Sequence, residues 1–150
     1  MSYWPGFGDL LGLYVQVKGT PAIGLHQLLA RPSRARLQRV ILAHELGHHV
    51  LHAGTFIARF YCGIDRTVVG HLEAAAEQGA AGHLLPREVV LNLFHTAGQV
   101  GPEEVETLAD WADVPFGFVE WWCNELQRER LVPGAYITHP RVWAPSAIDE

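Results

Sequence analysis

The chain has 150 residues, of which 49% are hydrophobic and 18% are charged, and its formal net charge is −5. This length and composition predict one globular domain with a buried core, and the acidic balance argues against a nucleic-acid-binding surface, which is normally basic. No apolar run approaches the roughly 18 residues of a membrane helix and no signal-peptide pattern is present, so we expect a cytoplasmic protein without membrane association.

Two short β-prone segments occupy the N-terminal region, residues 1–30. They are residues 10–17, with the sequence LLGLYVQV, and residues 22–25, with the sequence AIGL. The residues between them, from Lys18 to Pro21, are predicted to form a turn. This pattern predicts a small antiparallel sheet, formed by one β-hairpin, ahead of the first helix.

The following stretch, residues 33–52, is predicted to be helical because apolar and histidine side chains recur near helical spacing. Ser33 follows a proline and is the expected N-cap, and Gly54 is the expected stop. The motif HELGH begins at residue 44, so it is predicted to lie in the middle of this helix.

The motif HELGH has the residue types of a catalytic metal site. His44 and His48 are four residues apart, which places both imidazoles on one helix face within reach of a single ion. A zinc ion with three protein ligands keeps a position open for water, whose pKa it lowers to about 7, and Glu45 is the expected general base. Gly47 predicts a close approach by another backbone, because glycine inside a helix otherwise costs about 1 kcal/mol.

A third metal ligand must come from elsewhere in the chain. His52 is unsuitable because a continuous helix places it about 12 Å along the axis from His44. Residues 69–85 are predicted to form a second helix that ends before a proline, and Glu73 and Glu77 lie one turn apart on it. Either carboxylate could reach the metal while the other orients a histidine, and spacing favours Glu73 only slightly.

The loop between the two helices, residues 53–66, is rich in aromatic side chains. We expect it to overhang the cleft, where Tyr61 is a candidate for binding substrate or stabilising a developing oxyanion. Cys62 in this loop and Cys123 are too few for a disulfide framework, so both are predicted to be free thiols. Three other histidines are unranked candidates for the oxyanion role: His71, His83 and His95.

Three further helical patterns follow, at residues 86–97, 102–112 and 115–128. The second and third together resemble a helix-turn-helix, which offers a DNA-binding interpretation. The would-be recognition helix is rich in aromatic and acidic side chains and has no Arg or Lys before Arg128, so phosphate would be repelled. We therefore predict a helical subdomain that packs its aromatics on the core, or a protein-docking surface, followed by an irregular tail over residues 131–150. The aromatic residues are Phe116, Phe118, Trp121 and Trp122.

Three segments of the chain resemble the ImmA/IrrE family of metallopeptidases: ILAHELGHHVLH, LEAAAEQGAAGHLLP and LADWADVPFGFV. The resemblance extends roughly from residue 24 to residue 126. It implies that His44, His48 and Glu73 are the metal ligands and that Glu45 is the general base, as in other gluzincin-like enzymes. The chain departs from the family pattern at Gly79, His83 and Phe116.

The resemblance further implies one metallopeptidase domain over residues 1–150, with the metal-binding helices at 33–85 and a helical subdomain at 86–130. The expected fold is α+β, with the small sheet packed on a zincin-like helical core and a C-terminal helix-turn-helix-like bundle. The expected cofactor is Zn²⁺, although Mn²⁺ and Fe²⁺ suit the same ligands. The expected substrate is a helix-turn-helix transcriptional repressor, without direct nucleic-acid binding.

Two hypotheses from other functional classes are alternatives to the enzyme hypothesis. In the first, the chain is a non-catalytic protein-interaction module stabilised by metal. A structural zinc usually has four protein ligands, and Glu77, His49 or His52 could supply the fourth. In the second, which the acidic charge disfavours, the chain is a DNA-binding regulator whose affinity falls steeply with salt.

Overall fold

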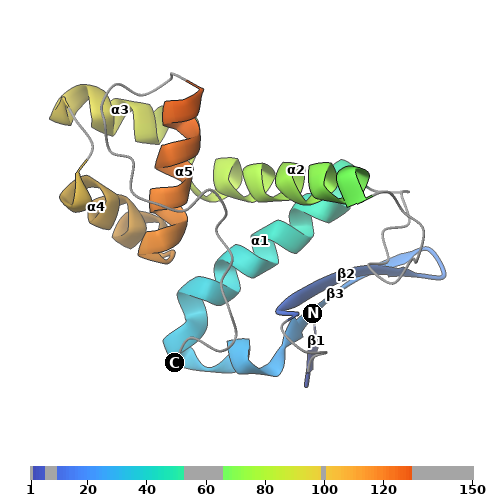
Figure 1. Ribbon diagram of the computed structural model, residues 1–150. Coiled ribbons are helices and arrows are strands. Elements are labelled where there is room, and N and C mark those ends of the chain that lie inside the picture. Colours follow the sequence, from blue (N-terminus) through green and yellow to red (C-terminus); the bar gives the residue numbers. More distant parts are fainter. Residues whose placement is uncertain (1, 6–9, 53–65, 99–100, 130–150) are drawn as a thin grey trace. The chain divides into compact units, whose positions relative to one another are not determined.

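The computed structural model describes residues 2–5, 10–52, 66–98 and 101–129. Within these residues the protein is α+β, with five α-helices and one three-stranded sheet (Figure 1). The predicted fold class is confirmed at this level. The described residues up to Ala80 form one compact unit and those from Ala81 onward form a second.

The hairpin predicted near the N-terminus is present. Strand β2, Gly12–Val17, pairs antiparallel with strand β3, Thr20–His26. The loop between them has only two residues, Lys18 and Gly19, and both have positive φ angles, of 50° and 82°. Such a turn matches the right-handed twist of the strands. The predicted turn was therefore two residues too long, and Pro21 belongs to β3.

The sheet differs from the prediction because it is mixed. Strand β1, Ser2–Trp4, pairs in parallel with β3, so the strand order is β1-β3-β2. Three residues are too few for a recognisable alternation, which explains why this strand was missed. The ring of Trp4 lies across Gly24, where an added Cβ would come within 1.9 Å of the ring. This contact requires glycine in the middle of β3.

The first long helix, α1, spans Ala35–His52. A 3-10 turn, Pro32–Arg34, precedes it, so Ser33 lies within that turn and not at the expected N-cap position. Proline fixes its own φ near the helical value, which allows the turn to start at this point. Gly54, the predicted stop, lies outside the described residues.

Helix α1 is attached to the sheet by packing and by polar contacts. It packs against β2 and β3, which lie alongside it (Figure 1). The side-chain amide of Gln38 donates a 3.0 Å hydrogen bond to the carbonyl of Leu29 and also bonds the hydroxyl of Tyr3 in β1. Leu25 in β3 and Val40 in α1 are fully buried. The sheet therefore holds the helix that carries the HELGH motif.

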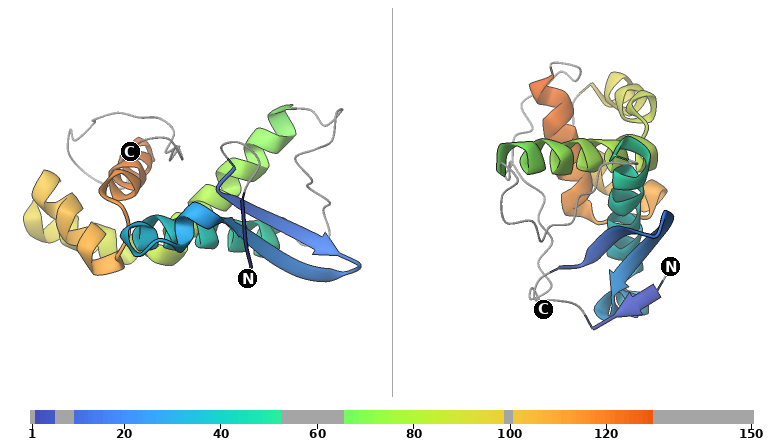
Figure 2. Two further views of the ribbon diagram at one scale, coloured as in Figure 1. Left: turned by 90° about the horizontal axis from the view of Figure 1, so that it is seen from below. Right: turned by 90° about the vertical axis from the view of Figure 1, so that its right-hand side faces the viewer.

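The remaining helices follow the predicted ranges closely. Helix α2 spans Arg66–Leu84, and α3, α4 and α5 span Arg87–Ala97, Pro102–Ala112 and Phe116–Arg128. Figure 2 shows α3, α4 and α5 as a three-helix cluster within the second unit. The likeness of this cluster to a helix-turn-helix stays a prediction. None of the helices in the described part of the chain combines the length and hydropathy that a membrane span requires.

Three of the four aromatic side chains predicted to pack on the core lie in the core of the second unit, whereas the fourth, Phe116, is 40% exposed. Phe118, Trp121 and Trp122 are buried, and the Trp122 indole Nε1 donates a 3.1 Å hydrogen bond to the Leu85 carbonyl. Cys123 is a buried free thiol, as predicted, and desolvation by burial raises its pKa to about 12. These side chains are thus not available to read DNA bases.

Candidate metal centre

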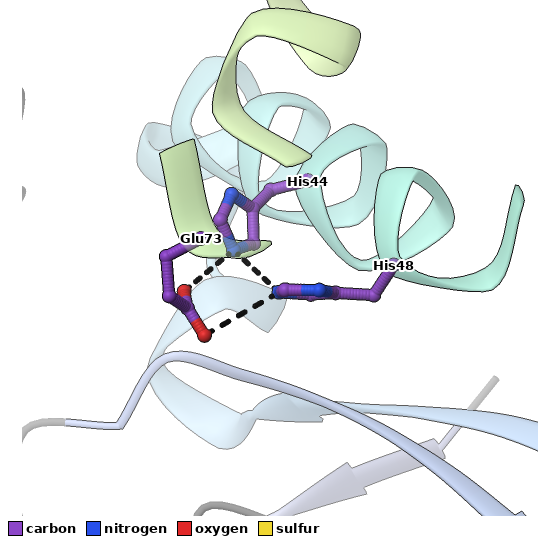
Figure 3. Close-up of polar contacts among 3 residues, drawn as sticks. All are labelled: His44, His48 and Glu73. Atoms are coloured by element: carbon purple, nitrogen blue, oxygen red, sulfur yellow. Dashed lines mark hydrogen bonds and ion pairs between the residues drawn. The ribbon is translucent and has the colours of Figure 1, made fainter. Parts of the chain in front are cut away.

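Helices α1 and α2 bring three potential ligands together. His44 and His48 project from α1, and Glu73 projects from α2 toward both imidazoles (Figure 3). The two imidazole Nε2 atoms are 3.0 Å apart. The Glu73 carboxylate lies 3.2 Å from the Nε2 of His44 and 3.6 Å from that of His48. All three residues thus direct one donor atom each toward a common point.

The spacing of these donor atoms fits a tetrahedral zinc ion. Ligand atoms about 2.0 to 2.1 Å from zinc at tetrahedral angles are about 3.3 to 3.4 Å from one another. The Nε2 atoms of His44 and His48 are 3.0 Å apart, and the two Glu73 oxygens are each close to one of them: Oε2 lies 3.2 Å from His44 and Oε1 lies 3.6 Å from His48, all near that value. Two imidazole lone pairs at this distance repel unless a proton or a cation lies between them. The donor set and its geometry therefore suit a divalent cation.

Burial differs across the three ligands. The side chains of His44 and His48 are 15% and 8% exposed, whereas that of Glu73 is 26% exposed. The carboxylate therefore has the most access to solvent. The group found among the described residues contains three side chains, which is one fewer than a closed structural zinc site requires.

The close crossing of α1 and α2 positions Glu73 against the histidines. A Cβ added to Gly47 would lie 2.9 Å from the carbonyl oxygen of Ala76 and 3.1 Å from its Cα. Gly47 follows His44 by three residues, and Ala76 follows Glu73 by three, so the ligands lie one turn from the crossing on each helix. The predicted approach of a second backbone at Gly47 is confirmed.

Gly47→Ala is expected to destabilise the protein by about 1 to 3 kcal/mol and to weaken metal binding. The new methyl group overlaps the α2 backbone, so the helices must separate and withdraw Glu73. Gly70→Ala is the matched control, because nothing lies within 4 Å of its Cβ position on α2. That variant should be at least as stable as the wild type, since glycine disfavours a helix. Chemical denaturation and zinc titration of both variants give the comparison; equal zinc affinities would contradict this account of the crossing.

Strand β2 runs along the side of α1 next to the candidate ligands. A Cβ added to Gly12 would lie 2.4 Å from a carboxylate oxygen of Glu45. Two residues further, the hydroxyl of Tyr14 is hydrogen-bonded to the Nδ1 of His49 at 2.9 Å. Residues two apart on a strand and residues four apart on a helix are separated by similar distances along their axes, roughly 6 to 7 Å. Gly12 and Tyr14 of β2 can therefore lie opposite Glu45 and His49 of α1. Sequence reasoning missed both contacts.

Glu45 is buried, with 5% of its surface exposed, and Gly12 leaves space for its carboxylate beside β2. It is not one of the three grouped ligands. Its position in the chain, next to His44, places it about 100° around the helix axis from that ligand. Its role as a base remains a prediction.

The other candidate site residues from the sequence analysis do not belong to the ligand group found among the described residues. Glu77 is outside the ligand group, and His49 is bonded to Tyr14. The His52 side chain and Tyr61 lie outside the described part of the chain. The three unranked histidines are all exposed: His71, His83 and His95. Of the two carboxylates that spacing left open, the structure therefore brings Glu73 to the histidines.

Comparisons with known proteins add no relative. A scan against family models, a search of curated proteins and a search of solved structures each found no match.

Proposed function

We propose that this protein is a zinc-dependent metallopeptidase. The observation that carries the proposal is the convergence of the two HELGH histidines and Glu73 on one point, with donor separations of 3.0 to 3.6 Å. Such a set, with two imidazoles and one carboxylate, is the ligand set of known zinc peptidases. The resemblance of the surrounding sequence to ImmA/IrrE peptidases supports the same assignment.

The chain's own residues have distinct roles in this proposal. His44, His48 and Glu73 would hold the ion. A bound zinc would supply Lewis acidity, which polarises a carbonyl group and makes water more acidic. Glu45 then accepts a proton from the attacking water and passes it to the nitrogen of the leaving amine. The scissile C–N bond breaks, and a carboxylate and an amine are released.

A catalytic site is favoured over a purely structural one by two features of the described residues. The group has three protein donors, which leaves a coordination position for water or substrate. Glu73 is also 26% exposed, so solvent reaches this side of the ligand set. The alternative of a metal-stabilised interaction module predicts tight zinc binding without hydrolysis.

The proposed substrate is a helix-turn-helix transcriptional repressor. This part of the proposal rests on the resemblance to ImmA/IrrE peptidases, which typically cleave such repressors to relieve repression in stress responses. The acidic net charge of −5 agrees with a basic protein substrate more readily than with DNA as a ligand.

Cleavage of purified helix-turn-helix repressors tests the proposal. We expect at least one repressor of a panel to be cut at a single site when zinc is supplied. Removal of the metal by a chelator should abolish cleavage, and added zinc should restore it, because the three ligands alone cannot supply the Lewis acid. Mass spectrometry of the fragments identifies the cut. Cleavage that continues unchanged in excess chelator would contradict a metal-dependent mechanism.

A further inference from the structure

The charge of this chain is divided unevenly along its length. Residues 1–80 contain five Asp and Glu against seven Lys and Arg, whereas residues 81–150 contain 11 against four. The net negative charge therefore belongs to the second part of the chain. Helix α4 is its most acidic element, with four carboxylates in 11 residues and no Lys or Arg.

The outer face of α4 combines carboxylates with a large aromatic ring. Glu103, Glu106 and Asp110 are exposed, and their spacing of three and four residues puts them on one face of the helix. Trp111 follows Asp110 and is 60% exposed. We call these four residues the α4 face. The opposite side of α4, with Val105, Leu108 and Ala109, is buried in the second unit.

Two carboxylates of the α4 face have no ionic partner among the described residues, and its aromatic ring is largely exposed. Glu103 and Glu106 form no ion pair with any residue that the structure describes. Trp121 and Trp122 are buried in the core, in contrast to the exposed Trp111. Exposed tryptophan is costly in water and is enriched at the centres of protein interfaces. An aromatic anchor with a charged rim is the usual composition of a docking surface.

We propose that the α4 face docks the basic DNA-binding surface of the protein substrate. This inference rests on the proposed function, which makes that substrate a DNA-binding repressor. A protein that binds DNA carries a surface of Lys and Arg that complements phosphate, and a row of helix carboxylates presents a similar array of negative charge. Trp111 would then pack on aliphatic stems or a guanidinium group within the basic surface.

The proposal has a consequence for which form of the repressor is bound. The same basic surface cannot contact DNA and the α4 face at once. The peptidase would therefore bind only repressor molecules that are not bound to their operator DNA. Added duplex DNA would compete with the peptidase for the repressor. Charge steering should also make association fast at low salt and slower as salt increases.

A labelled peptide tests the docking chemistry without any need for cleavage. The probe is a fluorescent amphipathic helical peptide of Lys, Arg and Leu, and its control has Glu in place of Lys and Arg. Binding to the full chain is measured by fluorescence anisotropy at low and high salt. We expect binding of the basic peptide only, with Kd rising about fivefold or more for Glu106→Lys and about tenfold for Trp111→Ala. Glu88→Lys on α3 is the charge-matched control and should bind with nearly wild-type affinity.

The outcomes separate this inference from the proposed function. If the variants bind the basic peptide as tightly as the wild type, the docking inference is overturned, even where a repressor is still cut. If the peptide binds at the α4 face but no repressor is cleaved, the docking inference stands and the proposed activity is in error. The inference is also overturned if excess duplex DNA does not reduce binding of the repressor to the peptidase. It is overturned as well if Trp111→Ala weakens peptide binding only because the peptidase no longer self-associates.

Discussion

Glu45→Gln is expected to lower kcat for peptide cleavage by about 10²- to 10⁴-fold without loss of the metal ion. Glutamine has nearly the same volume as glutamate, so it fits the space that Gly12 leaves for the Glu45 side chain. The amide, however, cannot accept a proton from water. Because the three grouped ligands remain unchanged, the variant should bind zinc with the wild-type stoichiometry.

The measurement is kcat for a cleavable repressor, together with metal content and thermal stability, in the wild type and in Glu45→Gln. Equal stability and metal content make the loss of rate attributable to chemistry. A variant that retains full activity would remove Glu45 from the mechanism. A variant that loses its zinc would instead assign Glu45 a role in holding the site together.

Glu73→Gln is expected to weaken zinc binding by at least about 100-fold, because it replaces a charged carboxylate ligand with a neutral amide. Mutation of residues that only orient a metal ligand already lowers metal affinity by about 10- to 100-fold. Glu77→Gln removes the same charge one turn further along α2, where the carboxylate is outside the ligand group. We expect this control to bind zinc almost as the wild type does. The pair therefore separates direct ligation from the general effect of negative charge on α2.

Competition with a chromophoric chelator gives both dissociation constants under the same conditions. Circular dichroism checks that α2 remains helical in each variant. Equal losses of zinc affinity in Glu73→Gln and Glu77→Gln would show that only the negative charge of α2 matters for binding. A larger loss for Glu77→Gln would make Glu77 the ligand in place of Glu73.

Local signals in the sequence were sufficient for most of the secondary structure. The turn-prone residues from Lys18 to Pro21 located the hairpin, and Pro86, Pro102 and Pro115 bound the later helices. Each of these signals depends on residues close together in the chain. Local signals also misled in two places, because the predicted turn was two residues too long and because Ser33 has the residue type of an N-cap but lies in a 3-10 turn.

Contacts between distant residues were harder to predict. The motif located His44 and His48, but spacing left Glu73 and Glu77 as competing ligands until the crossing of α1 and α2 was known. That crossing depends on Gly47 and Ala76, of which only the glycine gave a signal.

The pairing of β1 with β3 and the bond between Tyr14 and His49 likewise join residues that are far apart in sequence. No pattern within one segment encodes such contacts. A comparison of repeat distances, two residues on the strand against four on the helix, could have indicated the match between β2 and α1.

The central claim is that His44, His48 and Glu73 hold one metal ion. The most direct measurement is zinc stoichiometry combined with X-ray absorption spectroscopy of the zinc-loaded chain, compared with the double variant His44→Ala/His48→Ala. We expect one tightly bound zinc per wild-type chain, with two imidazole nitrogens and oxygen ligands at about 2.0 to 2.1 Å, and no tight zinc in the double variant. A wild-type chain without zinc, or a double variant that binds zinc equally well, would contradict the assignment of this site.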